Sequence, residues 1–127
     1  AVRALVACMR GLGVQRLLYV SGVGAGDSRG HGGFLYDRIV QPWLLRTIYD
    51  DKERSEALLR GSQLRWTICR PGFLTNGAML ARYRIVTRLD ALPRLRAGPI
   101  SRADVAHFLL DEAERDEFVG LTPLVCY

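Results

Sequence analysis

The sequence lacks the features that mark several large classes of protein. No apolar run approaches the roughly 18 residues that a membrane-spanning helix needs, so no membrane partner is expected. The three cysteines, Cys8, Cys69 and Cys126, lie far apart and form no CxxC pair, which indicates reduced, mostly buried thiols in a cytoplasmic protein. The two histidines have no nearby acidic or cysteine partners, so no metal site is expected.

Lysine is also nearly absent. Lys52 is the only one, and the net charge of +5 comes almost entirely from arginine. A basic stretch, opposed only by Asp90, consists of Arg82, Arg84, Arg88, Arg94, Arg96 and Arg102. Such a stretch can attract an anion, for example a nucleotide phosphate or a nucleic acid. Because no nucleic-acid-binding motif accompanies it, a solvated basic surface is the favoured interpretation, and no nucleic-acid partner is expected.

The first half of the chain shows helical and strand patterns in turn. Apolar residues at helical spacing predict a helix over residues 2–11, which glycines then end, and a continuous apolar run predicts a buried strand over 17–20. A glycine-rich loop follows at 22–33 and is interpreted as an active-site lid. A second helical region runs from Pro42 to Gly61, where a break near Tyr49 and Asp50 is an alternative.

The second half continues the alternation. A buried strand is predicted at 66–69, and a short strand is expected near 85–87 within an irregular region. Ser101 and Asp104 indicate the capped start of another helix, and 124–126 predict a closing strand. Short connections between alternating helices and strands favour the α/β class, with a mostly parallel sheet and flanking helices. Because so few parallel strands leave an open edge, further strands are expected to precede Ala1.

Four segments, in order, carry a resemblance to a known family. They are Gly13-Val14-Gln15-Arg16 leading into a strand that ends at Ser21, Asp51-Lys52 to Ser62, Leu64-Arg65-Trp66-Thr67-Ile68-Cys69-Arg70-Pro71-Gly72, and Ile100-Ser101-Arg102-Ala103-Asp104-Val105-Ala106. Together they resemble the atypical short-chain dehydrogenases, an NAD(P)H-binding group that includes biliverdin reductase B (flavin reductase) and the NmrA-like proteins. The resemblance implies that residues 1–127 are the C-terminal portion of one Rossmann-like domain whose N-terminal strands are missing.

The resemblance also implies an activity. The protein is expected to be an NAD(P)H-dependent oxidoreductase that uses NADP or NAD and transfers hydride to a small organic or flavin-like acceptor. Two alternatives stay open, namely an NmrA-like regulator that binds dinucleotide without turnover and an inactive truncated chain. Neither the identity of the small-molecule substrate nor the oligomeric state follows from the sequence.

Two residues are the catalytic candidates that the resemblance implies. Lys52 occupies the place of the lysine in the Tyr-x-x-x-Lys motif, which holds the nicotinamide ribose, although Ile48 stands where the tyrosine would be and Tyr49 is one residue off. The alternative for Lys52 is a surface pair with Glu56 at i, i+4. Ser21 ends a buried strand, where ligands bind in α/β sheets, and it is expected beside the nicotinamide or the substrate.

The remaining cofactor-binding candidates lie next to strand ends. They are Gly22, which follows Ser21, and Arg70, Pro71, Gly72 and Phe73, whose backbone would line the nicotinamide pocket. For the Arg70 side chain, a structural ion pair with a carboxylate elsewhere in the fold is the favoured interpretation. The spacing Gly22-x-Gly24-x-Gly26-Asp27 is not the GxGxxG of a pyrophosphate cradle.

Overall fold

The computed structural model describes residues 1–21, 46–87 and 98–127, with the backbone alone for 46–52. The elements, in chain order, are α1 (Val2–Leu12), β1 (Arg16–Val20), α3 (Arg46–Arg60), β2 (Arg65–Pro71), β3 (Phe73–Thr75), β4 (Arg84–Val86), β5 (Pro99–Ser101), α4 (Arg102–Arg115) and β6 (Leu124–Cys126). No helix in this part of the chain is both long and apolar enough to cross a membrane.

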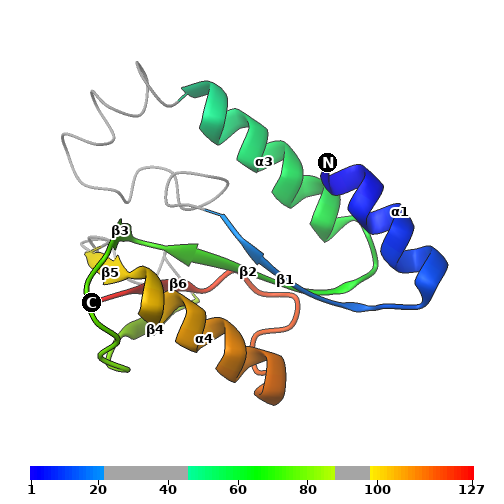
Figure 1. Cartoon of the computed structure of the whole chain (residues 1–127). Coiled ribbons are helices and arrows are strands. Elements are labelled where there is room, and N and C mark those ends of the chain that lie inside the picture. Colours follow the sequence, from blue (N-terminus) through cyan, green and yellow to red (C-terminus); the bar gives the residue numbers. More distant parts are fainter. Residues whose placement is uncertain (22–45, 88–97) are drawn as a thin grey trace.

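The main sheet has four strands in the order β1-β2-β6-β4. The pairs β1–β2 and β2–β6 are parallel, and β4 pairs with β6 in the antiparallel direction. A second, two-stranded parallel sheet joins β3 to β5. Figure 1 shows α1 and α3 side by side over one face of the main sheet and α4 over the other. The predicted α/β class with a mostly parallel sheet and flanking helices is therefore confirmed.

Side chains along β2 point alternately to the two faces of the sheet, and each face contacts a different helix. Thr67 donates a hydrogen bond to Glu112 on α4 at 3.2 Å, whereas the guanidinium of Arg70 bonds to Glu56 on α3. Residues an odd number of positions apart in a strand point to opposite faces, so each helix meets its own set of β2 side chains. β2 is consequently covered on both faces, and its last five residues are buried.

Most of the elements predicted from the sequence are confirmed. Gly13 ends α1 in the left-handed conformation with φ 73°, which glycine adopts without a steric penalty. The side chain of Ser101 caps α4 by accepting the N–H of Asp104 at 3.0 Å. The alternative of a helix break near Tyr49 and Asp50 is wrong, because α3 continues unbroken through both positions. The helix start at Pro42 falls outside the described residues.

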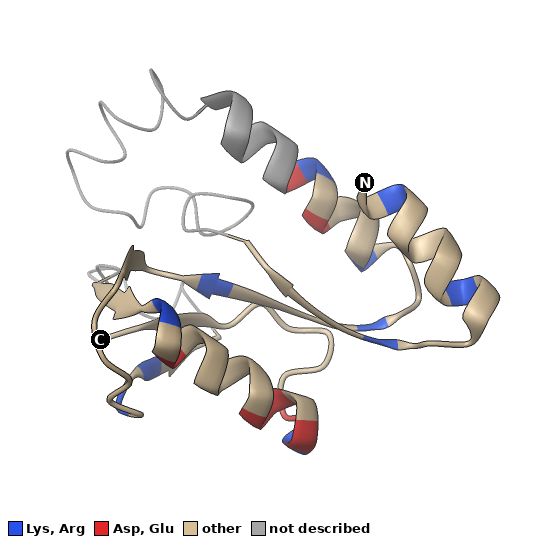
Figure 2. Ribbon diagram, viewed as in Figure 1, with Lys and Arg blue, Asp and Glu red and all other residues tan. Residues whose placement is uncertain are grey.

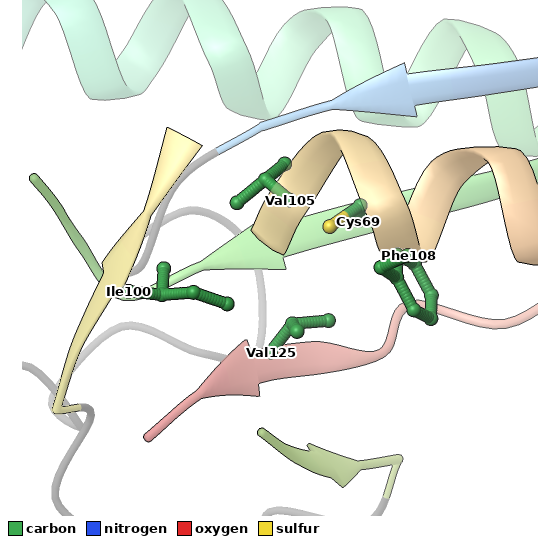
Figure 3. Packing of buried hydrophobic residues seen from close by; sticks show 5 residues of the cluster. All are labelled: Cys69, Ile100, Val105, Phe108 and Val125. Atoms are coloured by element: carbon green, nitrogen blue, oxygen red, sulfur yellow. The ribbon is translucent and has the colours of Figure 1, made fainter. Parts of the chain in front are cut away.

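The apolar core lies between β2, β5, β6 and α4. Its buried members are Cys69, Ile100, Val105, Phe108 and Val125 (Figure 3). Burial raises the pKa of the Cys69 thiol to about 12, so this sulfur stays protonated and packs as a small apolar group. Cys126 is buried as well, whereas Cys8 on α1 is exposed. All three thiols are free and two of them are buried, so the prediction of free, mostly buried thiols is confirmed.

An ion-pair network lies at the amino-terminal ends of β1 and β2. Arg16 pairs with Asp116 at 2.6 Å and with Glu112 at 2.8 Å, and Arg65 pairs with Asp116 at 3.2 Å. Figure 2 shows acidic residues at the carboxyl end of α4, where Glu112 belongs to the helix and Asp116 is its C-cap residue. The Arg16 hydrogen bond and the charges of Arg16 and Arg65 hold the pKa of Asp116 below its ordinary range. The network joins the amino-terminal ends of β1 and β2 to the carboxyl end of α4.

Candidate functional site

The carboxyl ends of β1, β2 and β6 meet at one edge of the sheet because the three strands are parallel. Ser21 follows β1 there, and its backbone N–H donates to the carbonyl of Cys69 on β2 at 2.8 Å. Gly72 follows β2, and its N–H donates to the carbonyl of Val125 on β6 at 2.9 Å. Parallel α/β sheets bind their ligands at this edge.

The Ser21 side chain has an unusual environment. Its residue is only 3% exposed, yet its hydroxyl has no hydrogen-bond partner in the part of the chain that the structure describes. A buried hydroxyl without a partner costs roughly 1–3 kcal/mol, so proteins seldom keep one without a reason. The structure therefore gives Ser21 an unused hydrogen-bonding group at the ligand-binding edge.

The segment that follows β2 is tightly packed at the same edge. The N–H of Phe73 donates to the carbonyl of Gly98 at 3.2 Å, so Gly72 and Phe73 both use their N–H groups within the fold. A Cβ on Gly72 would overlap that same carbonyl oxygen, which explains glycine at this position. The segment can offer a cofactor its carbonyl oxygens and its surface. The pocket-lining role predicted for Pro71, Gly72 and Phe73 stays a prediction.

Arg70 is fully buried and forms a two-point ion pair with Glu56. Its Nε lies 3.2 Å from Oε1 of Glu56 and its Nη2 lies 2.5 Å from Oε2. This confirms the structural ion pair expected for Arg70, whereas its direct role in cofactor binding stays a prediction. Glu56 is 1% exposed, so it is not the surface residue that the alternative for Lys52 requires.

Two candidates are placed only in part. Lys52 lies in α3, where its backbone is described and its side chain is not. Position 52 precedes Glu56 by four residues, which puts both positions on the helix side that meets β2. Gly22 and the glycine-rich loop at 22–33, interpreted as a lid, fall outside the described residues. The roles of Lys52, Gly22 and the loop stay predictions.

Asp104 does more at this edge than the sequence indicates. Its carboxylate accepts the N–H of Leu80 at 3.0 Å and of Ala81 at 2.8 Å, and it also accepts from the hydroxyls of Ser101 and Tyr127. Burial acts to raise the pKa of Asp104, but hydrogen bonds from Tyr127, the two backbone N–H groups and Ser101 outweigh burial and lower it. The ionised carboxylate thus fixes the chain around residues 80–81.

The sequence carries only part of the signal for Asp104. The capping pattern of Ser101 and Asp104 is confirmed, but nothing in the sequence shows that two distant backbone N–H groups point at this carboxylate. Two arginines of the basic stretch also have structural partners, since Arg84 donates to the Tyr127 carbonyl and Arg102 to the Asn76 side chain. Arg88, Arg94 and Arg96 lie outside the described residues, so the nature of the stretch stays a prediction.

No set of three or more potential metal ligands gathers within residues 1–21, 53–87 and 98–127. A buried unpaired hydroxyl beside glycine-containing backbone at a strand end suits an organic ligand better than an ion. At this edge the structure brings together the Ser21 hydroxyl, which has no partner among the described residues, and the backbone of Gly72 and Phe73.

Comparisons with known proteins agree with this arrangement. The sequence model of the family described as NAD(P)H-binding matches residues 1–116. A search of curated proteins gave no match. The protein ChuY of Escherichia coli CFT073 has a similar structure, with 23% identity and a TM-score of 0.83 over 98% of this chain and 63% of that chain.

Two further structures have the same fold. An anaerobillin reductase of Escherichia coli O157:H7 shares 22% identity and a TM-score of 0.82, over 98% of this chain and 56% of that chain. A short-chain dehydrogenase/reductase of Veillonella parvula, solved in complex with NADP, shares 20% identity and a TM-score of 0.79, over 99% of this chain and 57% of that chain. The present chain thus spans a little over half of each similar structure, and the fold is Rossmann-like.

Proposed function

The chain belongs to the NAD(P)H-binding family, and from that premise we propose that it forms part of an NAD(P)H-dependent oxidoreductase of the atypical short-chain type. It would contribute the nicotinamide and substrate side of the site. The observation that carries the proposal is the buried, unpartnered hydroxyl of Ser21 at the ligand-binding edge of the sheet. A carboxamide or carbonyl group at that edge would supply the partner that the hydroxyl lacks.

The residues present fit a nicotinamide ring and its ribose. Ser21 would donate a hydrogen bond, the carbonyl oxygens of Pro71 and Gly72 would face the ring, and Gly22 would allow close approach. Lys52, on the side of α3 that meets the sheet, would hold the ribose hydroxyls. A bound nicotinamide in its reduced form would give a hydride to the acceptor and become oxidised, and the acceptor, which gains two electrons, would take a further proton from water or a nearby group.

Both the acceptor and the cofactor form are part of the proposal. We propose a small organic or flavin-like acceptor and NADP or NAD as cofactor. The support is that one similar structure is called a reductase and another was solved with NADP. Ile48 in place of the usual tyrosine means that the proton comes from a group other than a tyrosine on α3 at that position.

The same Ile48 favours a second candidate function, a dinucleotide-binding regulator without turnover. A single measurement on the full-length protein distinguishes the two functions. Steady oxidation of NADPH in the presence of an acceptor supports the enzyme, whereas tight binding of NADPH without turnover against a broad set of quinones and flavins supports the regulator.

Replacing Lys52 by alanine tests the cofactor site. The full-length variant should bind NADPH about ten- to a hundred-fold more weakly, because a charged hydrogen-bond donor contributes roughly 1.5–3 kcal/mol. Fluorescence titration with NADPH measures this. Arg54→Ala is the matched control, since Arg54 is an exposed cation on the same helix and should leave affinity unchanged.

The Ser21→Ala and Tyr49→Phe variants complete the test. Ser21→Ala should weaken NADPH binding or lower turnover while the free energy of unfolding stays the same or rises, because it removes a buried group without a partner. Tyr49→Phe should have little effect. If Tyr49→Phe abolishes turnover while Lys52→Ala leaves the affinity for NADPH intact, the placement of this helix relative to the cofactor is wrong.

The 127-residue chain alone should bind NADPH poorly, because its sequence contains no GxGxxG cradle and the pyrophosphate contributes much of the affinity. The same fluorescence titration checks this. A dissociation constant as low as that of the full-length protein would contradict it.

A further inference from the structure

Arg70 and Glu56 form the most deeply buried ion pair between described side chains. Their side chains are 0% and 1% exposed, whereas every other such pair includes at least one side chain that is 20% exposed or more. Removing two charges from water is costly, and an apolar pair of similar volume often stabilises a fold as well or better. Stability alone therefore gives no reason for a charged pair at this place.

The pair constrains the geometry of α3 more tightly than an apolar contact would. Nε of Arg70 lies 3.2 Å from Oε1 of Glu56, and Nη2 lies 2.5 Å from Oε2. A planar guanidinium that contacts both oxygens of a carboxylate fixes the distance between the two side chains and also their relative orientation. Apolar attraction has no preferred direction, so it holds a helix on a sheet without fixing its rotation.

Few other described side chains of α3 are buried. Within residues 53–60, only Glu56 and Leu59 are buried. Leu59 lies nearer the carboxyl end of the helix, where the Arg10 guanidinium also donates to the carbonyl of Ser62, just beyond the helix. Within this stretch, Glu56 is consequently the buried side chain that lies nearest to the amino-terminal turns of α3.

The ion pair lies about one helical turn from Lys52. Lys52 precedes Glu56 by four residues, which corresponds to about 6 Å along the helix axis. Figure 1 shows that α3 runs opposite to β2, so the amino-terminal turns of the helix lie toward the carboxyl ends of the strands. A rotation of α3, or a shift of α3 along β2, would therefore displace position 52 relative to the ligand-binding edge.

Arg70 also lies beside Ser21. The register of β1 and β2 ends at Val20↔Cys69, and the N–H of Ser21 donates to the Cys69 carbonyl at 2.8 Å, which extends the same ladder by one residue. Ser21 is thus the neighbour of Arg70, and neighbouring residues of paired strands point to the same face of the sheet. That face is the one covered by α3, because the Arg70 guanidinium bonds to Glu56. The ion pair hence joins α3 to the strand ends at the candidate site.

We propose that the Arg70–Glu56 ion pair positions Lys52 against the nicotinamide ribose by fixing α3 relative to the ends of β1 and β2. The inference rests on the proposed oxidoreductase function. Arg70 and Glu56 are positioning residues in this role, because they act through the backbone of α3 and need not touch the cofactor. A folded protein that keeps α3 on the sheet but lacks the pair should bind NADPH more weakly.

Replacing both partners by apolar residues separates positioning from stability. The full-length Arg70→Met/Glu56→Leu protein should unfold at about the denaturant concentration of the wild type, because the exchange removes both charges together. Its dissociation constant for NADPH, measured by fluorescence, should rise about ten-fold, a loss no larger than that of Lys52→Ala. Arg60→Met is the matched control, since the Arg60 side chain is 40% exposed, lies 3.6 Å from the same carboxylate and should leave the affinity unchanged.

A double-mutant cycle with Lys52 tests whether the pair acts through that residue. In the Lys52→Ala background, the apolar exchange should weaken NADPH binding no further, because the contact that the pair positions is already absent. A general distortion of the site would instead weaken binding by the same factor in both backgrounds.

Arg70→Lys provides a second, milder cycle, and it decides the question if the apolar exchange does not fold. The lysine keeps the charge pair but loses the two-point contact with Glu56. The dissociation constant of NADPH should rise about three-fold in this variant, and the rise should again be absent in the Lys52→Ala background.

The outcomes separate the inference from the proposed function. If the folded apolar variant binds NADPH as tightly as the wild type, or if its loss is the same with and without Lys52, the pair does not position Lys52. If the wild type binds NADPH but Lys52→Ala leaves the affinity intact, the ribose role of Lys52 is wrong and the inference fails with it. If the full-length wild type does not bind NADPH at all, the oxidoreductase function itself is overturned.

Discussion

β1 and β2 are both apolar parallel strands, but their surroundings differ. β2 lies between β1 and β6, and its last five residues are buried, whereas every residue of β1 is at least partly exposed and Val20 is 41% exposed. The helices differ in the same way, since Met9 is the one buried residue of α1 while four residues of α4 are buried. Burial in this molecule follows position in the sheet, and apolar sequence alone does not determine it.

Among the substitutions that test this difference in burial, the one at Glu112 is expected to have the largest effect on the free energy of unfolding. Its carboxylate is buried and accepts from Arg16, Thr67 and the N–H of Phe118. Glu112→Ala should lower the free energy of unfolding by about 3–5 kcal/mol, as for other broken buried ion pairs. Chemical denaturation of the 127-residue chain measures it. Glu114→Ala, an exposed change on the same helix, is the control, and equal effects of both changes would contradict the buried network.

Two leucines, one buried and one exposed, test how much apolar packing contributes to stability in the two regions. Leu124 on β6 is fully buried, and Leu124→Ala should cost about 2–5 kcal/mol of unfolding free energy. Leu12 at the end of α1 is 74% exposed, and Leu12→Ala should change the unfolding free energy by less than about 0.5 kcal/mol. If the two changes cost the same in denaturant unfolding, the region of α1 and β1 is as well packed as the carboxyl-terminal region.

A third test of the comparison concerns the outer edge of β1, the side that does not face β2. Within the described chain β1 pairs with β2 alone, so its other edge offers free N–H and carbonyl groups to a second molecule. The 127-residue chain should therefore self-associate, and Val20→Lys should weaken the association because a charged edge discourages strand pairing. Size-exclusion chromatography across a range of concentrations shows this. A monomer at all concentrations would mean that the edge is protected.

The smallest effect is expected in the pH dependence of the free energy of unfolding. Arg16 and Arg65 lower the pKa of Asp116 below its usual 3.8 in the folded chain. A carboxyl whose pKa is depressed by folding stabilises the fold above the unfolded pKa, and this contribution is lost as the pH falls through the folded pKa. Asp116→Asn should remove that part of the acid destabilisation. Unfolding free energies between about pH 2.5 and about pH 6 would show a shallower dependence for the variant.

Asparagine is the suitable replacement at position 116. Asp116 caps α4 in the left-handed conformation with φ 54°, which asparagine also tolerates. An unchanged slope with pH in the Asp116→Asn variant would mean that other carboxyl groups dominate acid unfolding.

Local patterns allowed most of the elements to be predicted. The amphipathic spacing of α1, the Gly13 stop and the Ser101 cap are short-range features, and the structure contains them where the sequence places them. The continuous course of α3 was harder to predict. Asp50 and Glu53 form a good local capping pattern, but tertiary contacts such as Glu56 with Arg70 hold the helix against the sheet.

The candidate site could be predicted less completely. Strand ends point to Ser21 and to residues 70–73, because the rule for parallel sheets needs only the positions of strands. The partners within the site depend on segments that are distant in sequence. β3 and β5 are three residues each and become strands only by pairing with one another, and the contact of Asp104 with Leu80 joins residues 24 positions apart. No local pattern contains such information.

The order of strands in the sheet also affects how the chain forms during synthesis. β2 occupies the centre of the sheet, but its second neighbour, β6, begins more than fifty residues later, at Leu124. While the ribosome makes the intervening residues, one side of this largely buried central strand has no partner, and closing so long a loop is slow. We expect the nascent chain to depend on chaperones until residue 126 has left the ribosomal tunnel, and a stall before β6 should yield an aggregation-prone intermediate.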